Sequence, residues 1–162
     1  MLNFYTDNRD HLAPWEPHRN EEFYSIEYWR DQLKENRRDL GNGLAFKFAA
    51  LNPQRTEVMA VCNFANVVYG AFQACHLGYA VAEKYQGQGI MQEVVTAGLD
   101  YVFTKIGLHR VMANYILENE RSSVLLTRLG FEKEGLAKSY LNINGQWRDH
   151  VLTSKINPDS TA

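Results

Sequence analysis

The sequence has few cysteines and no long hydrophobic run, and these shortages exclude several classes of protein. Its two cysteines, Cys62 and Cys75, lie in apolar stretches without the spacing of a CxxC pair or a metal site. We therefore expect two buried, reduced thiols and no metal. No stretch of about 18 apolar residues suits a membrane span, and no apolar signal segment precedes the first charges. These absences predict a cytoplasmic protein without a membrane partner.

The chain also lacks an excess of charge of either sign. It carries 17 Lys and Arg against 19 Asp and Glu, a net charge of −2, and the two signs are mixed throughout. This balance gives no electrostatic case for binding nucleic acid. With 162 residues, 45% of them hydrophobic, and no repeat, low-complexity block or linker, the chain is expected to form one domain over 1–162.

Apolar spacing and turn residues predict the order of helices and strands. Ser25 is a plausible N-cap, Gly41 and Gly130 are plausible helix ends, and Asn144-Gly145 is a strong hairpin signal. One crossover helix links two strands, so we expect a mixed, mostly antiparallel sheet flanked by helices, an α/β (α+β) fold with one parallel strand pair. The predicted helices are 3–12, 26–40, 90–106 and 118–129, and the predicted strands are 44–51, 56–67, 74–82, 109–116, 132–142 and 146–154.

A glycine loop between a strand and a helix is the most informative stretch. It reads Gln86-Gly87-Gln88-Gly89-Ile90-Met91. The free N–H groups and the dipole of the following helix favour an anion, and Gly87 and Gly89 would let a diphosphate lie on the backbone. A bare GxG also suits an ordinary turn. The dinucleotide fingerprint GxGxxG and the P-loop are both absent.

The loop resembles the acetyl-CoA pyrophosphate loop of GNAT-type N-acetyltransferases, (Gln/Arg)-x-x-Gly-x-(Gly/Ala). Gln86 and Gly89 match this pattern, and Met91 departs from its last position. Asn119-x-x-Ser122, followed by Leu129-Gly130-Phe131, is similar to the second cofactor motif of the family. Further stretches resemble the RimJ branch of ribosomal-protein alanine N-acetyltransferases, namely 14–17, 63–68, 77–79, 112–115, 130–135 and 145–150.

The resemblance implies the GNAT fold, acetyl-CoA as cosubstrate, and the N-terminal segment of a ribosomal protein as acceptor. Members of the branch acetylate the N-terminal alanine of a protein of the small ribosomal subunit. Relatives usually begin with an extra strand, and this chain starts at the helix that follows it. We expect either a trimmed start or a sheet without that edge strand, and an unpaired edge would favour a homodimer over a monomer.

The resemblance also implies which residues hold acetyl-CoA. In the family the pantetheine arm adds to the first of two splayed strands, here 76–82 and 109–116, like an extra strand. Its amides would meet the backbone of Tyr79, Ala80 and Val81. Asn119 would bind the arm from the other side, although its position also suits a helix cap. The pyrophosphate would lie on Gln86, Gly87, Gln88, Gly89, Ile90 and Met91.

The acceptor amine determines how much base catalysis is needed. An α-amine has a pKa near 7.7–8.0, against about 10.4 for lysine, so a modest base or a water chain is enough for an N-terminus. Glu16 is the preferred residue for receiving the ammonium, and Asn114 and Tyr115 are candidates for holding a water. Each also has an ordinary structural interpretation, as a loop glutamate or as packing. Trp15, Glu16, Tyr140 and Trp147 are expected to shape the acceptor pocket, or to belong to the core.

The leaving thiolate needs a proton or a strong hydrogen-bond donor. Many GNAT enzymes use a tyrosine on the helix after the second motif, but Leu126 occupies that position here. Ser122 is the nearest substitute, beside the positive end of the helix dipole. A serine there also commonly bonds the backbone.

Two other functions compete with N-terminal acetylation. One keeps the fold and uses a small amine, such as a polyamine, an antibiotic or an amino acid; a polyamine would call for an acidic cluster at the acceptor mouth. The other is a non-catalytic acyl-CoA-binding or ribosome-assembly module.

Overall fold

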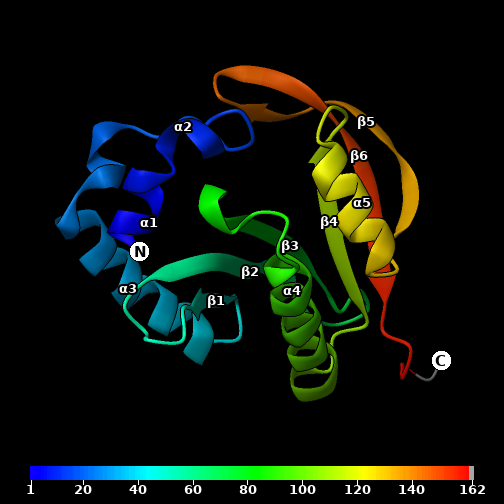
Figure 1. Cartoon of the computed structure of the whole chain (residues 1–162). Helices are drawn as coiled ribbons and strands as arrows, with labels where there is room; N and C mark the ends of the chain where they lie inside the picture. The colour runs from blue at the N-terminus through cyan, green and yellow to red at the C-terminus, as the bar shows by residue number, and fades with distance from the viewer. Residues whose placement is uncertain (161–162) are drawn as a thin grey trace.

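A six-stranded sheet forms the centre of the protein in a computed structural model that describes residues 1–160 (Figure 1). The strands are β1 (Phe46–Leu51), β2 (Val58–Val68), β3 (Ala74–Val81), β4 (Arg110–Ile116), β5 (Glu132–Ile143) and β6 (Gln146–Ile156). The helices are α1 (Leu2–Asp7), α2 (Arg9–Leu12), the 3-10 turn η1 (Glu21–Tyr24), α3 (Ile26–Gly41), the 3-10 turn η2 (Glu83–Tyr85), α4 (Ile90–Asp100), the π-helix η3 (Tyr101–Ile106) and α5 (Glu120–Arg128).

The strand order is β1-β2-β3-β4-β6-β5, and every pair is antiparallel except β3 with β4. The predicted mixed sheet with one parallel pair is therefore confirmed. The parallel pair is short, because its register runs only from Ala74–Arg110 to His76–Met112. Beyond that point the two strands diverge, as Figure 1 shows. This divergence leaves backbone groups of β3 unpaired toward β4.

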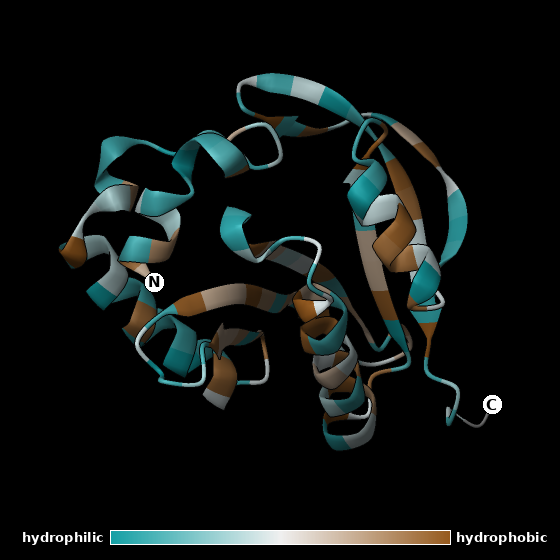
Figure 2. Ribbon diagram, viewed as in Figure 1, coloured by the Kyte–Doolittle hydropathy of each residue, from teal (hydrophilic) through white to brown (hydrophobic). Residues whose placement is uncertain are grey.

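Two apolar clusters cover opposite faces of the sheet. The larger cluster packs α4, η3 and α5 against the strands and includes Phe64, Val95 and Leu126. The smaller cluster joins α1, η1 and α3 to the other face through Tyr5, Phe23 and partly buried Trp29, with Tyr5 stacked on Trp29 at 5.1 Å between ring centroids. Figure 2 shows the tip of the β5–β6 hairpin as largely hydrophilic, in contrast to the apolar central strands. Within residues 1–160, no helix is long and apolar enough to cross a bilayer.

The N-terminal helix is the clearest difference from the predicted elements. The sequence predicted one helix over 3–12, but the structure has α1 and α2 with a break at Asn8. The Asn8 side chain donates to the Phe4 carbonyl at 2.8 Å and accepts from the Glu83 backbone N–H at 2.8 Å. The second partner lies 75 residues away, so the local pattern gave no sign of it. The η1 turn was not predicted.

Turn and cap residues mostly behave as their chemistry requires. Ser25 caps α3 by accepting from the Tyr28 backbone N–H at 3.2 Å. Asn144 and Gly145 both have positive φ, 46° and 82°, as a two-residue hairpin turn of this type demands. Gly130 follows α5 with φ of 78°, as predicted. Gly41 is still helical, and the left-handed residue after α3 is Gly43, with φ of 68°.

Candidate active site

The glycine loop between β3 and α4 has an open inner surface. Gly87 and Gly89 have φ of 70° and 78°, and no described atom lies within 4 Å of where a Cβ would stand on either residue. Gly89 is the N-cap of α4 and has no side chain to cover the first N–H groups of that helix. The loop therefore presents backbone donors and a helix dipole to whatever lies above it.

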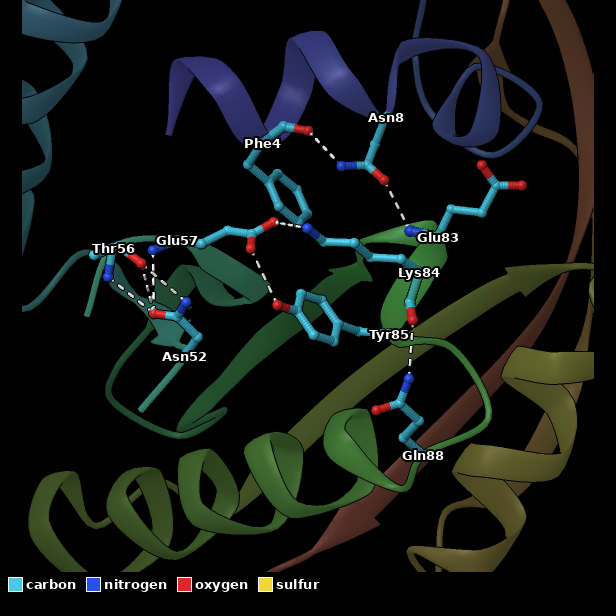
Figure 3. Close-up of polar contacts among 9 residues, drawn as sticks. All are labelled: Phe4, Asn8, Asn52, Thr56, Glu57, Glu83, Lys84, Tyr85 and Gln88. Atoms are coloured by element: carbon cyan, nitrogen blue, oxygen red, sulfur yellow. Dashed lines mark hydrogen bonds and ion pairs between the residues drawn. The ribbon is translucent and has the colours of Figure 1, made fainter. Parts of the chain in front are cut away.

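A set of polar contacts holds the turn before the loop in place (Figure 3). Glu57 of the β1–β2 connection pairs with the Lys84 ammonium at 2.5 Å and accepts from the Tyr85 hydroxyl at 3.1 Å. Asn8 binds the backbone of Glu83, as described above. The Gln88 side chain turns back to donate to the Lys84 carbonyl at 2.9 Å. The loop is thus anchored from the side away from α5.

The loop and α5 enclose a groove of about 590 Å³, here called the loop groove. Arg121 and Arg128 of α5 line it opposite the glycines, so the groove has cationic as well as backbone donors. Gln86 spans its entrance. The Gln86 side chain accepts from the Arg121 guanidinium and donates to His11 of α2 at 3.0 Å.

A second cavity of about 560 Å³, here called the sheet cavity, lies where β3 and β4 diverge. The strands contribute 77–81 and 114–116, and the N-terminal loop contributes Trp15, Glu16 and Arg19. Five residues line both spaces and so connect them, namely Tyr79, Gln86, Glu120, Arg121 and Ser122. A linear molecule can run from the loop groove between the splayed strands to the other face of the sheet.

Comparison with known proteins identifies the family. Residues 1–132 match the acetyltransferase (GNAT) domain family. The chain is 47% identical over 161 residues to the ribosomal protein uS5-alanine N-acetyltransferase of Escherichia coli (strain K12), an alignment covering 99% of this chain and 83% of that protein. The chain belongs to the GNAT acetyltransferase family.

Two solved structures support the same assignment. The crystal structure of ribosomal-protein-S5-alanine acetyltransferase from Vibrio fischeri matches with a TM-score of 0.96 at 42% identity, over 99% of this chain and 88% of that one. Mycobacterium smegmatis RimJ in complex with CoA-disulfide matches with a TM-score of 0.88 at 31% identity, over 96% and 75% of the two chains. As a GNAT enzyme, the protein takes an acetyl group from acetyl-CoA, so the expected fold, cosubstrate and enzyme class are confirmed.

Tyr79 supplies a direct observation that this GNAT site fits a ligand. Its hydroxyl is buried and has no hydrogen-bond partner within residues 1–160, although the residue lines both the loop groove and the sheet cavity. Burial raises the pKa of Tyr79 to about 12, and the nearby Ser122 side chain opposes that shift without forming a hydrogen bond of good geometry, so the hydroxyl stays protonated and available as a donor. An unpaired buried hydroxyl is costly, and a polar ligand would relieve that cost.

Asn119 and Ser122 lie together at the start of α5. The Asn119 side-chain oxygen accepts from the Ser122 backbone N–H at 3.1 Å, so the expected helix cap is present. The Asn119 amide NH₂ is left as a donor on the wall of the sheet cavity. Ser122 lines both spaces. Leu126, at the position of the usual family tyrosine, is buried in the larger apolar cluster.

Asn114 and Tyr115 do not come together. Neighbouring strand residues point to opposite faces, and Tyr115 packs against the cluster beneath α4 and α5. The Tyr115 hydroxyl donates to Ser123 Oγ at 3.1 Å. Asn114 is on the other face, where its amide donates to the Tyr140 hydroxyl at 3.4 Å. The two side chains thus start from opposite faces of β4, although both residues line the sheet cavity.

Glu16 faces the sheet cavity from the loop after α2. Burial raises the pKa of its carboxyl, and the Arg19 guanidinium at 3.4 Å partly opposes that shift. The Asn144 backbone N–H donates to the Glu16 carbonyl at 3.0 Å, so the tip of the β5–β6 hairpin rests on this loop. Trp15 and Glu16 thus form a wall of the cavity.

The two hairpin aromatics take different positions. Tyr140 is not itself among the residues that line the sheet cavity, but its ring centroid lies 5.6 Å from that of His150, which does line it. Trp147 is 65% exposed and is not among the residues that line the cavity. His150 lines the cavity, yet sequence reasoning did not single it out. Its place depends on the β4–β6 register, which pairs it with Ile116.

Proposed function

We propose that this enzyme transfers the acetyl group of acetyl-CoA to the N-terminal α-amine of a protein, with the N-terminal alanine of a small-subunit ribosomal protein as its acceptor. The observation that carries this proposal is likeness over almost the whole chain to enzymes named for alanine acetylation of ribosomal protein S5, in Escherichia coli and Vibrio fischeri. A ribosomal acceptor also places the reaction in the cytoplasm.

The proposed cofactor site consists of three groups of residues. The backbone of Tyr79, Ala80 and Val81, which lines the sheet cavity beyond the paired part of β3, pairs with the pantetheine amides. The loop 86–91 receives the pyrophosphate on its open glycines and on the first turn of α4. The Asn119 amide binds the arm from α5.

The proposed acceptor site lies on the opposite face of the sheet. Trp15, Glu16 and Asn114 line the slot, and Tyr140 adjoins it through the hydrogen bond from Asn114. Glu16 attracts the positively charged N-terminus, and its ion pair with Arg19 suits recognition rather than proton transfer. Trp147 extends this surface along the exposed hairpin, where it contacts later residues of the acceptor.

Departure of CoA relies on donors at the junction of the two spaces. The Ser122 hydroxyl stands in the first turn of α5, where the helix dipole stabilises a developing thiolate. The Tyr79 hydroxyl lines the same junction and is a second donor.

A polyamine acceptor fits the same cavity less well. Two of the three carboxylates in its lining are paired, Glu16 with Arg19 at 3.4 Å and Glu118 with Arg148 at 2.9 Å, and Arg121 adds a further cation. A spermidine site needs unpaired negative charge. The third carboxylate, Glu120, does not by itself form the acidic cluster expected for that alternative.

Mass spectrometry of ribosomal proteins tests the proposal. Small-subunit proteins isolated from cells lacking the enzyme should include one whose N-terminal alanine is unmodified, and incubation with the enzyme and acetyl-CoA should add one acetyl group to that residue. Acetylation of lysine side chains alone, or none at all with efficient spermidine acetylation, would reject it.

A further inference from the structure

His150 combines burial with a polar edge on the acceptor side of the sheet cavity. It is 3% exposed, yet it lines that cavity. It pairs with Ile116 across the β4–β6 ladder, so its side chain is on the same face as those of Ile116 and Asn114. This is the face turned toward the N-terminal helices, opposite α4 and α5.

A backbone hydrogen bond fixes which nitrogen of His150 carries the proton. Nδ1 lies 3.0 Å from the Arg148 carbonyl oxygen. A carbonyl only accepts, so Nδ1 must be the protonated nitrogen of the neutral ring. Nε2 then has a free lone pair. Nε2 makes no hydrogen bond within residues 1–160. It is also not one of the fully buried side-chain atoms of those residues that lack a hydrogen-bond partner.

A β-bulge shapes the surroundings of this nitrogen. The β5–β6 register shifts between Ala137 and Leu141, and Ser139 in the bulge has φ of 46°. The Ser139 N–H donates to the Asp149 carboxylate at 2.8 Å, which holds the bulge against β6. Tyr140 is thereby placed over the imidazole and within reach of Asn114. The ring of His150 is thus held in one orientation.

His150 lines the same cavity as the residues at which β3 and β4 diverge. Parallel pairing ends at His76–Met112, and the next residue of β3 on this face, Gly78, has no side chain. Its Cβ position is open to at least 4 Å. The next residue of β4 on this face after Asn114 is Ile116, about 7 Å further along the strand, and His150 is its partner on β6. An acceptor amine in this part of the cavity would therefore lie near both Gly78 and His150.

We propose that His150 Nε2 is the general base that takes the proton from the acceptor amine, an inference that rests on the proposed N-terminal acetylation. Nε2 accepts one proton from the ammonium form of the acceptor. The neutral amine then bonds to the acetyl carbonyl carbon as the carbon–sulfur bond breaks, and the electron pair of that bond stays on sulfur, which takes up the second proton lost by the nitrogen. The imidazolium returns its proton to solvent through the open cavity.

Charged and titratable groups from several elements face the same cavity. The N-terminal segment contributes His11, Glu16 and Arg19, and the start of α5 and the turn before it contribute Glu118, Glu120 and Arg121. Tyr140 of β5 contacts the imidazole directly. Glu16 and Glu118 are paired with arginines and His11 Nε2 is bonded to Gln86, whereas no hydrogen bond occupies His150 Nε2 within residues 1–160.

His150→Asn is the decisive variant, because its amide can still donate to the Arg148 carbonyl but has nothing at Nε2. With an alanine-terminated peptide at about pH 7, kcat should fall about a hundredfold while acetyl-CoA affinity stays within twofold. The deficit should shrink to less than about tenfold near pH 9.5, where the α-amine is already neutral. Added imidazole should restore part of the rate. His109→Asn, which alters a histidine bonded to Ser160 outside this cavity, is the matched control and should keep the wild-type rate.

The outcomes separate this inference from the function on which it rests. An inactive wild-type enzyme with this peptide would reject the proposed acceptor. If the wild type is active and His150→Asn has the same kcat, the role of His150 is overturned. It is also overturned if kcat of His150→Asn is reduced equally at both pH values and imidazole does not restore it. If His150→Asn fails to fold, His150→Gln and nitrogen NMR of the wild-type ring decide. A proton on Nε2 in the neutral ring would overturn the proposal, and one on Nδ1 supports it.

Discussion

At the scale of single residues, the Tyr79 hydroxyl is the most informative unsatisfied group. Removing it with Tyr79→Phe should stabilise the ligand-free protein by about 1 kcal/mol, because a buried donor without a partner costs about 1–3 kcal/mol. The same change should weaken acetyl-CoA binding about threefold to tenfold, if the ligand satisfies the hydroxyl. Thermal unfolding and calorimetry measure the two effects.

Tyr115→Phe is the control for this prediction, since the Tyr115 hydroxyl already bonds Ser123. It should lose about 1 kcal/mol of stability and keep its acetyl-CoA affinity. A Tyr79→Phe variant that was less stable than wild type and bound acetyl-CoA equally well would show that the hydroxyl has no ligand role.

Residue identity predicted backbone roles better than side-chain partners. The glycines of the loop, the caps Ser25 and Asn119, and the Asn144-Gly145 turn all follow from local chemistry that the sequence displays directly. The burial of Cys62 and Cys75 also follows from their apolar neighbours, and burial raises the pKa of each thiol to about 12. Strand alternation, in contrast, implies opposite orientations for Asn114 and Tyr115, although sequence reasoning grouped the two residues together. The position of His150 in the cavity could not be predicted without the register of β6 on β4.

At the scale of secondary-structure elements, the approach of α4 to the sheet depends on Gly98. A Cβ there would lie 2.6 Å from Phe64 Cε2 and 3.3 Å from Cys62 Sγ. Gly98→Ala should therefore destabilise the protein by about 1–3 kcal/mol, more than the roughly 1 kcal/mol that alanine gains in helix propensity. Urea unfolding gives the difference. Gly41→Ala, in a helical position with no atom within 4 Å, should be neutral or slightly stabilising. Equal behaviour of the two variants would refute close packing at Gly98.

The loop before α4 provides a second prediction at this scale. Gly89→Val places a branched side chain over the groove and should weaken acetyl-CoA binding at least tenfold, about 1.4 kcal/mol. Valine is also strained at the φ of 78°. Gly107→Val is the matched control, because Gly107 has φ of 77° and equally open surroundings after η3. Both variants should lose similar stability in thermal unfolding, but only Gly89→Val should lose affinity in calorimetry.

The order of elements was predictable because most of their determinants are local. Helical spacing, caps and turns lie within a few residues, and the strands follow from alternation. The break at Asn8 was not predictable, because its decisive partner is the Glu83 backbone far along the chain. The bulge at Ser139 depends in the same way on Asp149 of the neighbouring strand. Long-range pairing therefore decided the elements that sequence reasoning missed.

At the scale of the whole molecule, the sheet separates the two proposed substrate sites. The loop groove and α5 lie on one face, and the N-terminal helices with the β5–β6 hairpin enclose the other. Within residues 1–160, the two spaces share lining residues where β3 and β4 diverge. Such an arrangement suits direct attack by the amine, because acetyl-CoA and the acceptor can be bound at the same time, with the amine next to the thioester carbonyl.

The same arrangement leads to the prediction about acceptor choice. The slot bordered by Trp15 and Glu16, on whose loop Asn144 rests, suits an extended chain end. An α-amine is also partly neutral at physiological pH, whereas lysine is not. Peptides that begin with alanine should be acetylated on the α-amine. The rate at subsaturating peptide should rise with pH through about 7.7–8.0 and then level off. The same peptides with a blocked N-terminus and free lysines should be inert, and Glu16→Gln should raise the peptide KM more than it lowers kcat. Mass spectrometry locates the acetyl group, and steady-state kinetics give the constants. Efficient acetylation of lysine or spermidine beside inert alanine peptides would establish a small-amine acceptor instead.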